Sequence, residues 1–236
     1  MNNGLIFRLE NLSFQYPDST RALSNVSLSI YAGERVGIIG PNGAGKSTLI
    51  LHLNGILTGS GRVTVLGLKV EKKHLKEIRR NVGLVFQNPD DQLFCPSVFE
   101  DIAFGPHNLN LPEDEVQERV EESLDAVGLS GFGDRSSSHL SVGEKKRAAI
   151  ATVYSMYPEV FVFDEPTSSL DPRGRRSIIA LLKKLEKTQV IISHDLAMIG
   201  ELCSRIIVMD NGRIVADGIA GTVLSDTPTL ESCGLL

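Results

Sequence analysis

The sequence is short of cysteine, has no long apolar run and carries no excess of basic residues. Its 3 cysteines are an odd number without metal-like spacing, so we expect the reduced thiols of a cytosolic protein. No apolar run approaches the roughly 18 residues that cross a bilayer, and the first residues lack the basic start and apolar core of a signal peptide. The net charge of −5 argues against a general nucleic-acid binder. We therefore expect a cytosolic chain that reaches a membrane only through a partner.

The composition is that of an ordinary globular protein. A chain of 236 residues, 42% hydrophobic and 22% charged, can form one large α/β domain or a core that carries a smaller subdomain. Strand patterns dominate residues 1–87, helical patterns dominate 88–157, and alternating strands and helices resume in 158–236. Apolar spacing predicts a helix over Glu113–Val127, and Asp210-Asn-Gly212 predicts a tight turn between two strands.

The most informative run is GPNGAGKST at Gly40–Thr48. It follows the apolar stretch Arg35–Ile39 and precedes Leu49–Leu53, which is apolar at helical spacing, as in a phosphate-binding P-loop. Glycines let the backbone point N–H groups at phosphate oxygens, and the helix N-terminus adds its positive dipole end. We expect Lys46 to reach the β- and γ-phosphates and Ser47 to bind Mg²⁺. The predicted nucleotide-binding residues of this loop are Asn42, Gly43, Ala44, Gly45, Lys46, Ser47 and Thr48.

A second motif of phosphate chemistry is the acidic pair Asp164-Glu165, which ends the apolar run Val160–Phe163. Ligands of open α/β sheets collect at the carboxyl ends of strands, where the P-loop also lies. We expect Asp164 to hold Mg²⁺ and Glu165 to polarise a water aimed at the γ-phosphate. A solvated acidic pair at a strand end is the alternative, and the P-loop upstream disfavours it.

Six motifs occur in order along the chain. They are the P-loop at Gly40–Thr48, Gln87, Leu140-Ser-Val-Gly-Glu144, Asp164-Glu165, Ser169-Leu-Asp171 and His194. In this order they resemble the motifs of an ABC ATPase, and the resemblance covers essentially the whole chain. It implies an α/β fold of the P-loop NTPase type, with a RecA-like core and a small antiparallel β subdomain at 1–87 and 158–236, and an inserted helical subdomain at 88–157.

The same resemblance implies an ATPase that uses ATP and Mg²⁺. The catalytic residues that it implies are Glu165, His194 and Gln87, with His194 contacting the γ-phosphate and Gln87 sensing Mg²⁺ and the attacking water. The implied Mg²⁺ ligands are Ser47, Gln87 and Asp164. Tyr16 lies where the family places an aromatic ring under the adenine, although a lone tyrosine also serves packing.

The run Ser141-Val-Gly-Glu144 fits a helical capping box, whose N-terminus can accept a phosphate. In the family this helix end closes over the ATP of a partner chain, so the resemblance implies a head-to-tail dimer in which Ser141 and Gly143 contact that ATP. We expect a homodimer, with a heterodimer left open. The run departs from LSGGQ, since Val142 replaces a glycine and Glu144 a glutamine. These departures affect the expected hydrolysis rate more than the reaction type.

Residues Val85–Phe94 and Val98–Pro106 look like those of energy-coupling-factor importers, and in particular the ATPases of cobalt and nickel uptake systems. That resemblance implies two partners besides the second ATPase subunit, a transmembrane coupling protein and a small substrate-binding membrane protein, with the ATPase on the cytoplasmic face of the cell membrane. The residues expected to form an apolar docking groove are Phe86, Pro89, Leu93 and Phe94, with packing inside the subdomain as the alternative for them. The ATPases of biotin-type importers are short chains like this one, so a biotin-type importer stays open as an alternative.

Other P-loop proteins fit the sequence less well. An ABC ATPase that acts on DNA or ribosomes would need a long coiled coil or tandem ATPase domains, and neither is seen. A GTPase or small-molecule kinase would leave Gln87, the Ser141 run and His194 unexplained. A non-hydrolysing regulatory module is favoured by Val142 and Glu144 but opposed by Glu165 and His194.

Overall fold

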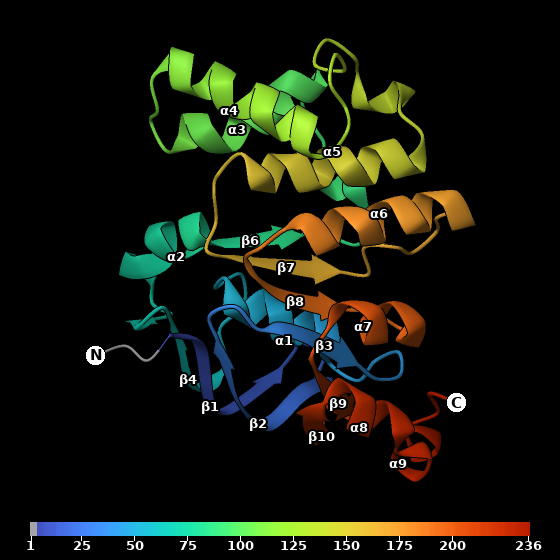
Figure 1. Cartoon of the computed structure of the whole chain (residues 1–236). Coiled ribbons are helices and arrows are strands. Elements are labelled where there is room, and N and C mark those ends of the chain that lie inside the picture. Colours follow the sequence, from blue (N-terminus) through green and yellow to red (C-terminus); the bar gives the residue numbers. More distant parts are fainter. Residues whose placement is uncertain (1–3) are drawn as a thin grey trace.

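A six-stranded sheet forms the centre of the molecule, with a layer of helices on one side and a smaller four-stranded sheet on the other (Figure 1). The computed structural model describes residues 4–236. The central sheet has the order β10-β9-β3-β8-β7-β6, with bounds β3 Arg35–Ile39, β6 Val82–Val85, β7 Val160–Asp164, β8 Thr188–Ile192, β9 Arg205–Asp210 and β10 Arg213–Ile219. The smaller sheet has the order β2-β1-β4-β5, with bounds β1 Leu5–Gln15, β2 Arg21–Tyr31, β4 Ser60–Val65 and β5 Leu68–Lys69.

Pairing in the central sheet is parallel from β9 through β3, β8 and β7 to β6, and only β10 runs antiparallel to its neighbour β9. These inner strands are nearly continuous apolar runs because both of their faces are covered. Strand β7 illustrates this, since Phe161 and Phe163 enter one buried cluster while Val160 and Val162 enter the other. The two hydrophobic cores therefore lie on opposite faces of one sheet.

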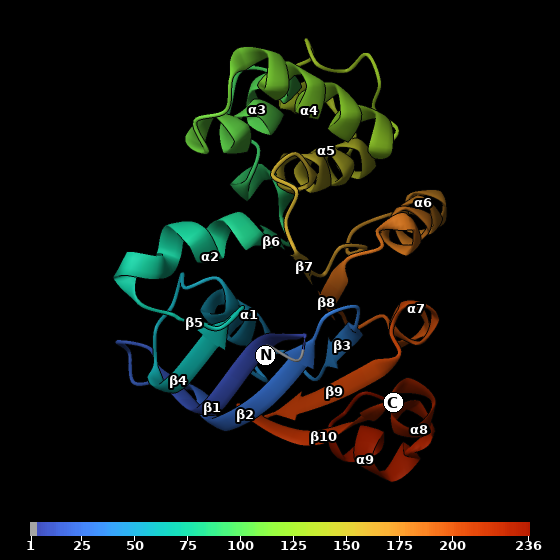
Figure 2. The same cartoon turned by 60° about the vertical axis from the view of Figure 1, so that its left-hand side comes forward.

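The helices cover the two faces unequally. Their bounds are α1 Lys46–Leu53, α2 Leu75–Asn81, α3 Val98–Asn108, α4 Glu113–Ala126, α5 Val142–Tyr154, α6 Pro172–Lys184, α7 Leu196–Leu202, α8 Ala220–Ser225 and α9 Thr227–Ser232. Helix α1 supplies residues to the core shared with the smaller sheet, whereas α3 to α7 supply residues to the other core. Figure 2 shows α3, α4 and α5 as a group set apart from the two sheets.

The predicted architecture, an α/β core with an antiparallel β subdomain and a helical subdomain, is confirmed. Helix α4 matches the predicted helix to within one residue, with Val116, Val120 and Leu124 buried along one face. The predicted turn is also confirmed, because Asn211 and Gly212 both have positive φ between β9 and β10. Helices α3 to α5 lie within 88–157, while the division into subdomains at that range stays a prediction. Within residues 4–236, no helix has the length and apolar content of a membrane span.

Glycines allow the loop between β3 and α1 to lie close to neighbouring backbone segments. Gly45 has a φ of 95°, and a Cβ placed on it would lie 2.3 Å from the carbonyl oxygen of Ala22. Gly40 is equally confined, since a Cβ there would lie 2.2 Å from the carbonyl oxygen of Met209. Gly43 has a φ of 80°, but a Cβ there would meet nothing within 4 Å. Packing therefore requires glycine at two of these positions, and backbone conformation alone favours it at the third.

We expect Gly45→Ala to destabilise the nucleotide-free protein by about 3 kcal/mol, because the left-handed conformation and the clash with Ala22 add together. Gly43→Ala is the matched control and should cost only about 1 kcal/mol, since the conformational penalty acts there without a clash. Urea unfolding of both variants measures the difference. Equal losses at the two positions would contradict this account of the loop.

Candidate nucleotide-binding site

Four loops meet at one edge of the central sheet and enclose a pocket of about 740 Å³. They follow the adjacent parallel strands β3, β8, β7 and β6, whose carboxyl ends face the same way. The pocket residues that these loops supply are Gly40 to Gly43, His194, Asp164 with Glu165, and Gln87. The structure thus brings together motifs that lie far apart in the sequence.

The P-loop lines this pocket along most of its length, and helix α1 begins at Lys46 as predicted. The Lys46 ammonium donates to the carbonyl oxygens of Gly40 and Pro41 at 2.8 and 2.9 Å. Burial lowers the pKa of Lys46, while the charges of Glu165 and Asp164 oppose that shift. Phosphate oxygens would be stronger acceptors for this ammonium than the two carbonyls.

Ala44 differs from its neighbours in the loop. Its side chain is buried, and its amide donates to the Pro41 carbonyl at 3.2 Å. The remaining predicted contact residues of the P-loop line the pocket, namely Asn42, Gly43, Gly45, Lys46, Ser47 and Thr48. A role for Ala44 in nucleotide binding stays a prediction that rests on its backbone alone.

Asp164 and Ser47 form a place where a divalent cation fits. Burial raises the pKa of Asp164, and a hydrogen bond from the Ser47 hydroxyl and the nearby Lys46 charge act in the opposite direction. The Oδ1 atom of Asp164 is buried and has no hydrogen-bond partner. A buried, unpartnered carboxylate oxygen beside a hydroxyl is a donor set that suits Mg²⁺.

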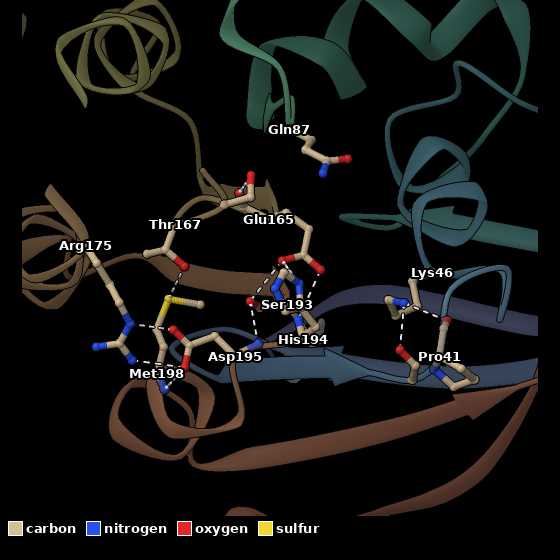
Figure 3. A network of polar contacts seen from close by, with 12 residues as sticks. Pro41, Lys46, Gln87, Glu165, Thr167, Arg175, Ser193, His194, Asp195 and Met198 are labelled. Atoms are coloured by element: carbon tan, nitrogen blue, oxygen red, sulfur yellow. Dashed lines mark hydrogen bonds and ion pairs between the residues drawn. The ribbon is translucent and has the colours of Figure 1, made fainter. Parts of the chain in front are cut away.

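Glu165 is held by the loop that follows β8, as Figure 3 shows. Its Oε1 atom accepts from the His194 amide at 3.0 Å, and its Oε2 atom accepts from the Ser193 hydroxyl at 3.0 Å. The His194 Nδ1 atom lies 2.9 Å from Oε2, although 70% of the His194 side chain is exposed. A carboxylate has about four acceptor positions, so these contacts leave Glu165 able to accept from a water in the pocket.

Tyr16 and Gln87 also line the pocket. The Tyr16 hydroxyl lies 3.1 Å from the Thr48 hydroxyl, and its ring packs edge-on against Phe14 with centroids 4.9 Å apart. Tyr16 therefore combines a packing contact with a position at the pocket wall. The Gln87 carbonyl is anchored by Lys146 at 3.0 Å, and its amide side chain reaches the pocket.

Ser141 and Gly143 do not reach this pocket. They line a second hollow of about 590 Å³ together with Ser169 and Asp171. The predicted capping box is present, since the Ser141 amide and hydroxyl both donate to Glu144 Oε2, at 2.8 and 2.6 Å. These hydrogen bonds lower the pKa of Glu144. The Glu144 carboxylate is therefore engaged by Ser141 at the N-terminus of its own helix.

Sequence reasoning missed three supporting contacts. The Arg175 guanidinium binds both carboxylate oxygens of Asp195, at 2.5 and 2.9 Å, directly after His194 (Figure 3). The hydrogen bonds from Arg175 lower the pKa of Asp195. The Ser193 hydroxyl donates to the Glu165 carboxylate. The Lys146 ammonium donates to the main-chain carbonyls of Gln87 and Glu165. Ser193 and Asp195 flank His194 in the sequence and could have been suspected, whereas an isolated lysine or arginine on a helix gives no such signal.

The expected docking groove needs a correction. Pro89 and Leu93 were expected on its surface, but both are buried, because Leu93 belongs to the core beneath helices α3 to α5. Phe94 is 65% exposed, and its ring packs edge-on against Phe104 with centroids 5.1 Å apart. Of the predicted set, Phe94 is exposed, Phe86 is half-buried against the core, and the apolar surface on this side is completed by Phe104, which was not predicted.

We expect Lys46→Ala to weaken ATP binding by at least about 100-fold, because it removes charge-assisted hydrogen bonds worth about 3 kcal/mol. Lys145→Ala is the matched control, since the Lys145 ammonium pairs with Asp90 and lies outside the pocket. Isothermal titration calorimetry with ATP measures both variants. Unchanged affinity in Lys46→Ala would remove the phosphate-binding role of the loop.

Comparisons with known proteins agree with this geometry. Residues 23–168 match the protein family described as ABC transporter. The energy-coupling factor transporter ATP-binding protein EcfA of Methanothermobacter thermautotrophicus is 50% identical over 236 residues, which cover 98% of this chain and 76% of that protein.

Solved structures give the same result. The structure of cbiO1 from Clostridium perfringens, part of the ABC transporter complex cbiONQ, has a TM-score of 0.85 at 38% identity, covering 98% of this chain and 95% of cbiO1. The ATP-binding cassette MJ0796, a dimer in a post-hydrolysis state bound to ADP and Pi, has a TM-score of 0.82 at 29% identity, covering 91% of this chain and 99% of that one. The family match spans more than half of the sequence, and the chain therefore belongs to the ATP-hydrolysing, ATP-binding proteins of ABC transporters.

Proposed function

We propose that this chain is the ATPase subunit of an energy-coupling-factor importer for cobalt or nickel ions, working at the cytoplasmic face of the cell membrane. The observation that carries the proposal is the pocket in which the P-loop faces Asp164 and Glu165. EcfA, at 50% identity, supports the energy-coupling-factor class. The cbiO1 structure, at 38% identity, supports an assembly with membrane components of the kind named for that protein.

In the proposed reaction, the amides of Gly43 and Gly45 and the Lys46 ammonium bind the β- and γ-phosphates. Ser47, Asp164 and Gln87 would hold Mg²⁺, which neutralises phosphate charge when bound. The Oδ1 atom of Asp164, which is buried without a hydrogen-bond partner, suits this role. Tyr16, at the pocket wall, would lie against the adenine.

Hydrolysis breaks the bond between the γ-phosphorus and the oxygen that bridges it to the β-phosphate, and yields ADP and phosphate. The Glu165 carboxylate orients the attacking water and accepts its proton. Ser193 and the His194 amide fix the carboxylate for this task. The His194 ring is exposed and lines the pocket, which supports the proposed contact with the γ-phosphate. This is the support for Glu165 and His194 as catalytic residues, with Gln87 sensing the water.

A second copy would complete the site by placing its Ser141 and Gly143 against the phosphates. A Cβ on Gly143 would meet only Leu170 Cδ2, at 3.8 Å, so packing within one chain does not require glycine there. Close approach of an external group would require it. The dimeric cassette MJ0796 supports this arrangement, and we propose a homodimer.

The transmembrane coupling protein would dock beside Phe94 and Phe104. A hollow of about 330 Å³ lies there, lined by Phe99, Phe104 and His107 among others. Exposed aromatic pairs of this kind suit a partner surface. The third component would be a small membrane protein that binds the transported substrate.

Two alternatives remain beside the proposal. A biotin-type importer would use the same ATPase site, so the pocket does not distinguish it from a metal importer. A non-hydrolysing regulatory module would be favoured by Glu144, but that carboxylate is engaged in the capping box, and Glu165 is held ready in the pocket.

We expect Glu165→Gln to lower ATP turnover by at least about 100-fold, because an amide cannot accept the proton of water. The variant should still bind ATP and elute as an ATP-loaded dimer on size-exclusion chromatography. Glu159→Gln serves as the control, since Glu159 forms an exposed pair with Lys187. Wild-type turnover in Glu165→Gln would refute the proposed general base.

The transported substrate is tested with the whole assembly. The chain is co-purified with its membrane partners and reconstituted in vesicles with external cobalt, nickel or biotin. We expect ATP-dependent accumulation of cobalt or nickel, measured by metal analysis, and none with the Glu165→Gln subunit. Accumulation of biotin without metal would replace the metal proposal by the vitamin alternative.

A further inference from the structure

Lys146 is a buried lysine on helix α5, two residues after the end of the capping box. Only 5% of its surface is exposed. Its ammonium donates to the Gln87 carbonyl at 3.0 Å, the Glu165 carbonyl at 3.1 Å and the Ser168 hydroxyl at 3.1 Å. A lysine ammonium has three N–H donors, so all of them are used inside the protein.

The three acceptors belong to two loops, one after β6 that carries Gln87 and one after β7 that carries both Glu165 and Ser168. Gln87 and Glu165 line the ATP pocket. Ser168 directly precedes Ser169, which lines the second hollow with Ser141. Lys146 itself lines neither hollow, so it reaches these loops from behind.

Glu165 needs such support because its backbone is unusual. It has a φ of 46°, a left-handed conformation that a residue with a side chain adopts at a cost of roughly 1–3 kcal/mol. Its amide donates to the Ile192 carbonyl at 2.9 Å, and its carbonyl accepts from Lys146 and from the Ser168 hydroxyl, the latter at 3.0 Å. These contacts hold the conformation that aims the carboxylate at Ser193 and His194.

Helix α5 also carries the loop that follows Gln87. The Gln92 side chain donates to the Ala149 carbonyl at 2.8 Å and to the Thr152 hydroxyl at 2.7 Å. A movement of α5 would therefore carry this loop with it and pull on Glu165 through Lys146. The same helix begins at the capped end that lines the second hollow.

We infer that Lys146 is a positioning residue for hydrolysis, which holds the main chain at Glu165 so that the carboxylate points into the ATP pocket and which ties this alignment to Gln87 and Ser168. The inference rests on the proposed role of Glu165 as general base. Lys146 is not among the residues that line the ATP pocket, so we expect it to act on the rate and not on ATP affinity.

The direct test is Lys146→Met, which keeps an unbranched apolar stem and removes the three donors. We expect kcat for ATP hydrolysis by the full chain to fall at least about tenfold, with KM for ATP changed less than about twofold. Lys145→Met is the matched control, since it neutralises the neighbouring residue of the same helix, whose partner is Asp90, and should keep the wild-type kcat. A wild-type kcat in Lys146→Met would overturn the inference.

Coupling to Glu165 is tested by combining the two substitutions. In the Glu165→Gln background, Lys146→Met should lower the residual turnover by less than about twofold, because its effect passes through the missing carboxylate. A further tenfold loss there would show an independent role and overturn the inference. Wild-type turnover in Glu165→Gln alone would instead refute the proposed general base, so the two failures are distinguishable.

A second variant guards against misfolding. If Lys146→Met does not unfold cooperatively in urea, Lys146→Gln takes its place, because the glutamine amide keeps two donors on a shorter side chain. Its kcat should fall at least about threefold at unchanged KM. A wild-type kcat in Lys146→Gln, or a loss confined to KM, would also overturn the inference.

Discussion

Strand β8 pairs in parallel with β3 on one side and with β7 on the other, and β7 pairs in turn with β6. Because parallel strands end at the same edge, this pairing places the P-loop, His194, Glu165 and Gln87 around one pocket. The alternating side chains of these strands also supply both hydrophobic cores. A shift in pairing would therefore disturb the site and the core together.

Opposite charges at this edge balance each other from two sides. Lys46 approaches Asp164 and Glu165 from the P-loop, and Lys146 approaches them from helix α5. Burial lowers the pKa of both lysines, and the two carboxylates oppose that shift. The two lysines differ in their partners, since Lys46 donates to carbonyls of its own loop, whereas Lys146 donates to two other loops, those that follow β6 and β7. Lys46 can therefore exchange its two carbonyl acceptors for phosphate oxygens, whereas Lys146 serves to hold the loops in place.

Helix α5 relates the two hollows of the molecule. Its capped N-terminus lines one of them, and one turn later Lys146 holds the loops of the other. The Ser141 hydroxyl is engaged by Glu144, so a phosphate that binds there must compete with that carboxylate. In the proposed dimer each copy would supply one ATP pocket and one hollow at Ser141. Helix α5 would then transmit closure of the dimer at the Ser141 hollow to Glu165 in the ATP pocket of the same copy.

The sequence by itself determined the local elements whose cause is local. The P-loop with its helix start at Lys46, the capping box at Ser141 and the turn at Asn211 follow from neighbouring residues, and all are present. Only the tertiary structure decided how distant residues meet. Gly45 must be glycine because the Ala22 carbonyl lies against it, Leu93 is buried because helices α3 to α5 cover it, and Lys146 is buried where the loops after β6 and β7 converge on it. Such contacts join residues far apart in the chain, so no local pattern of residue types announces them.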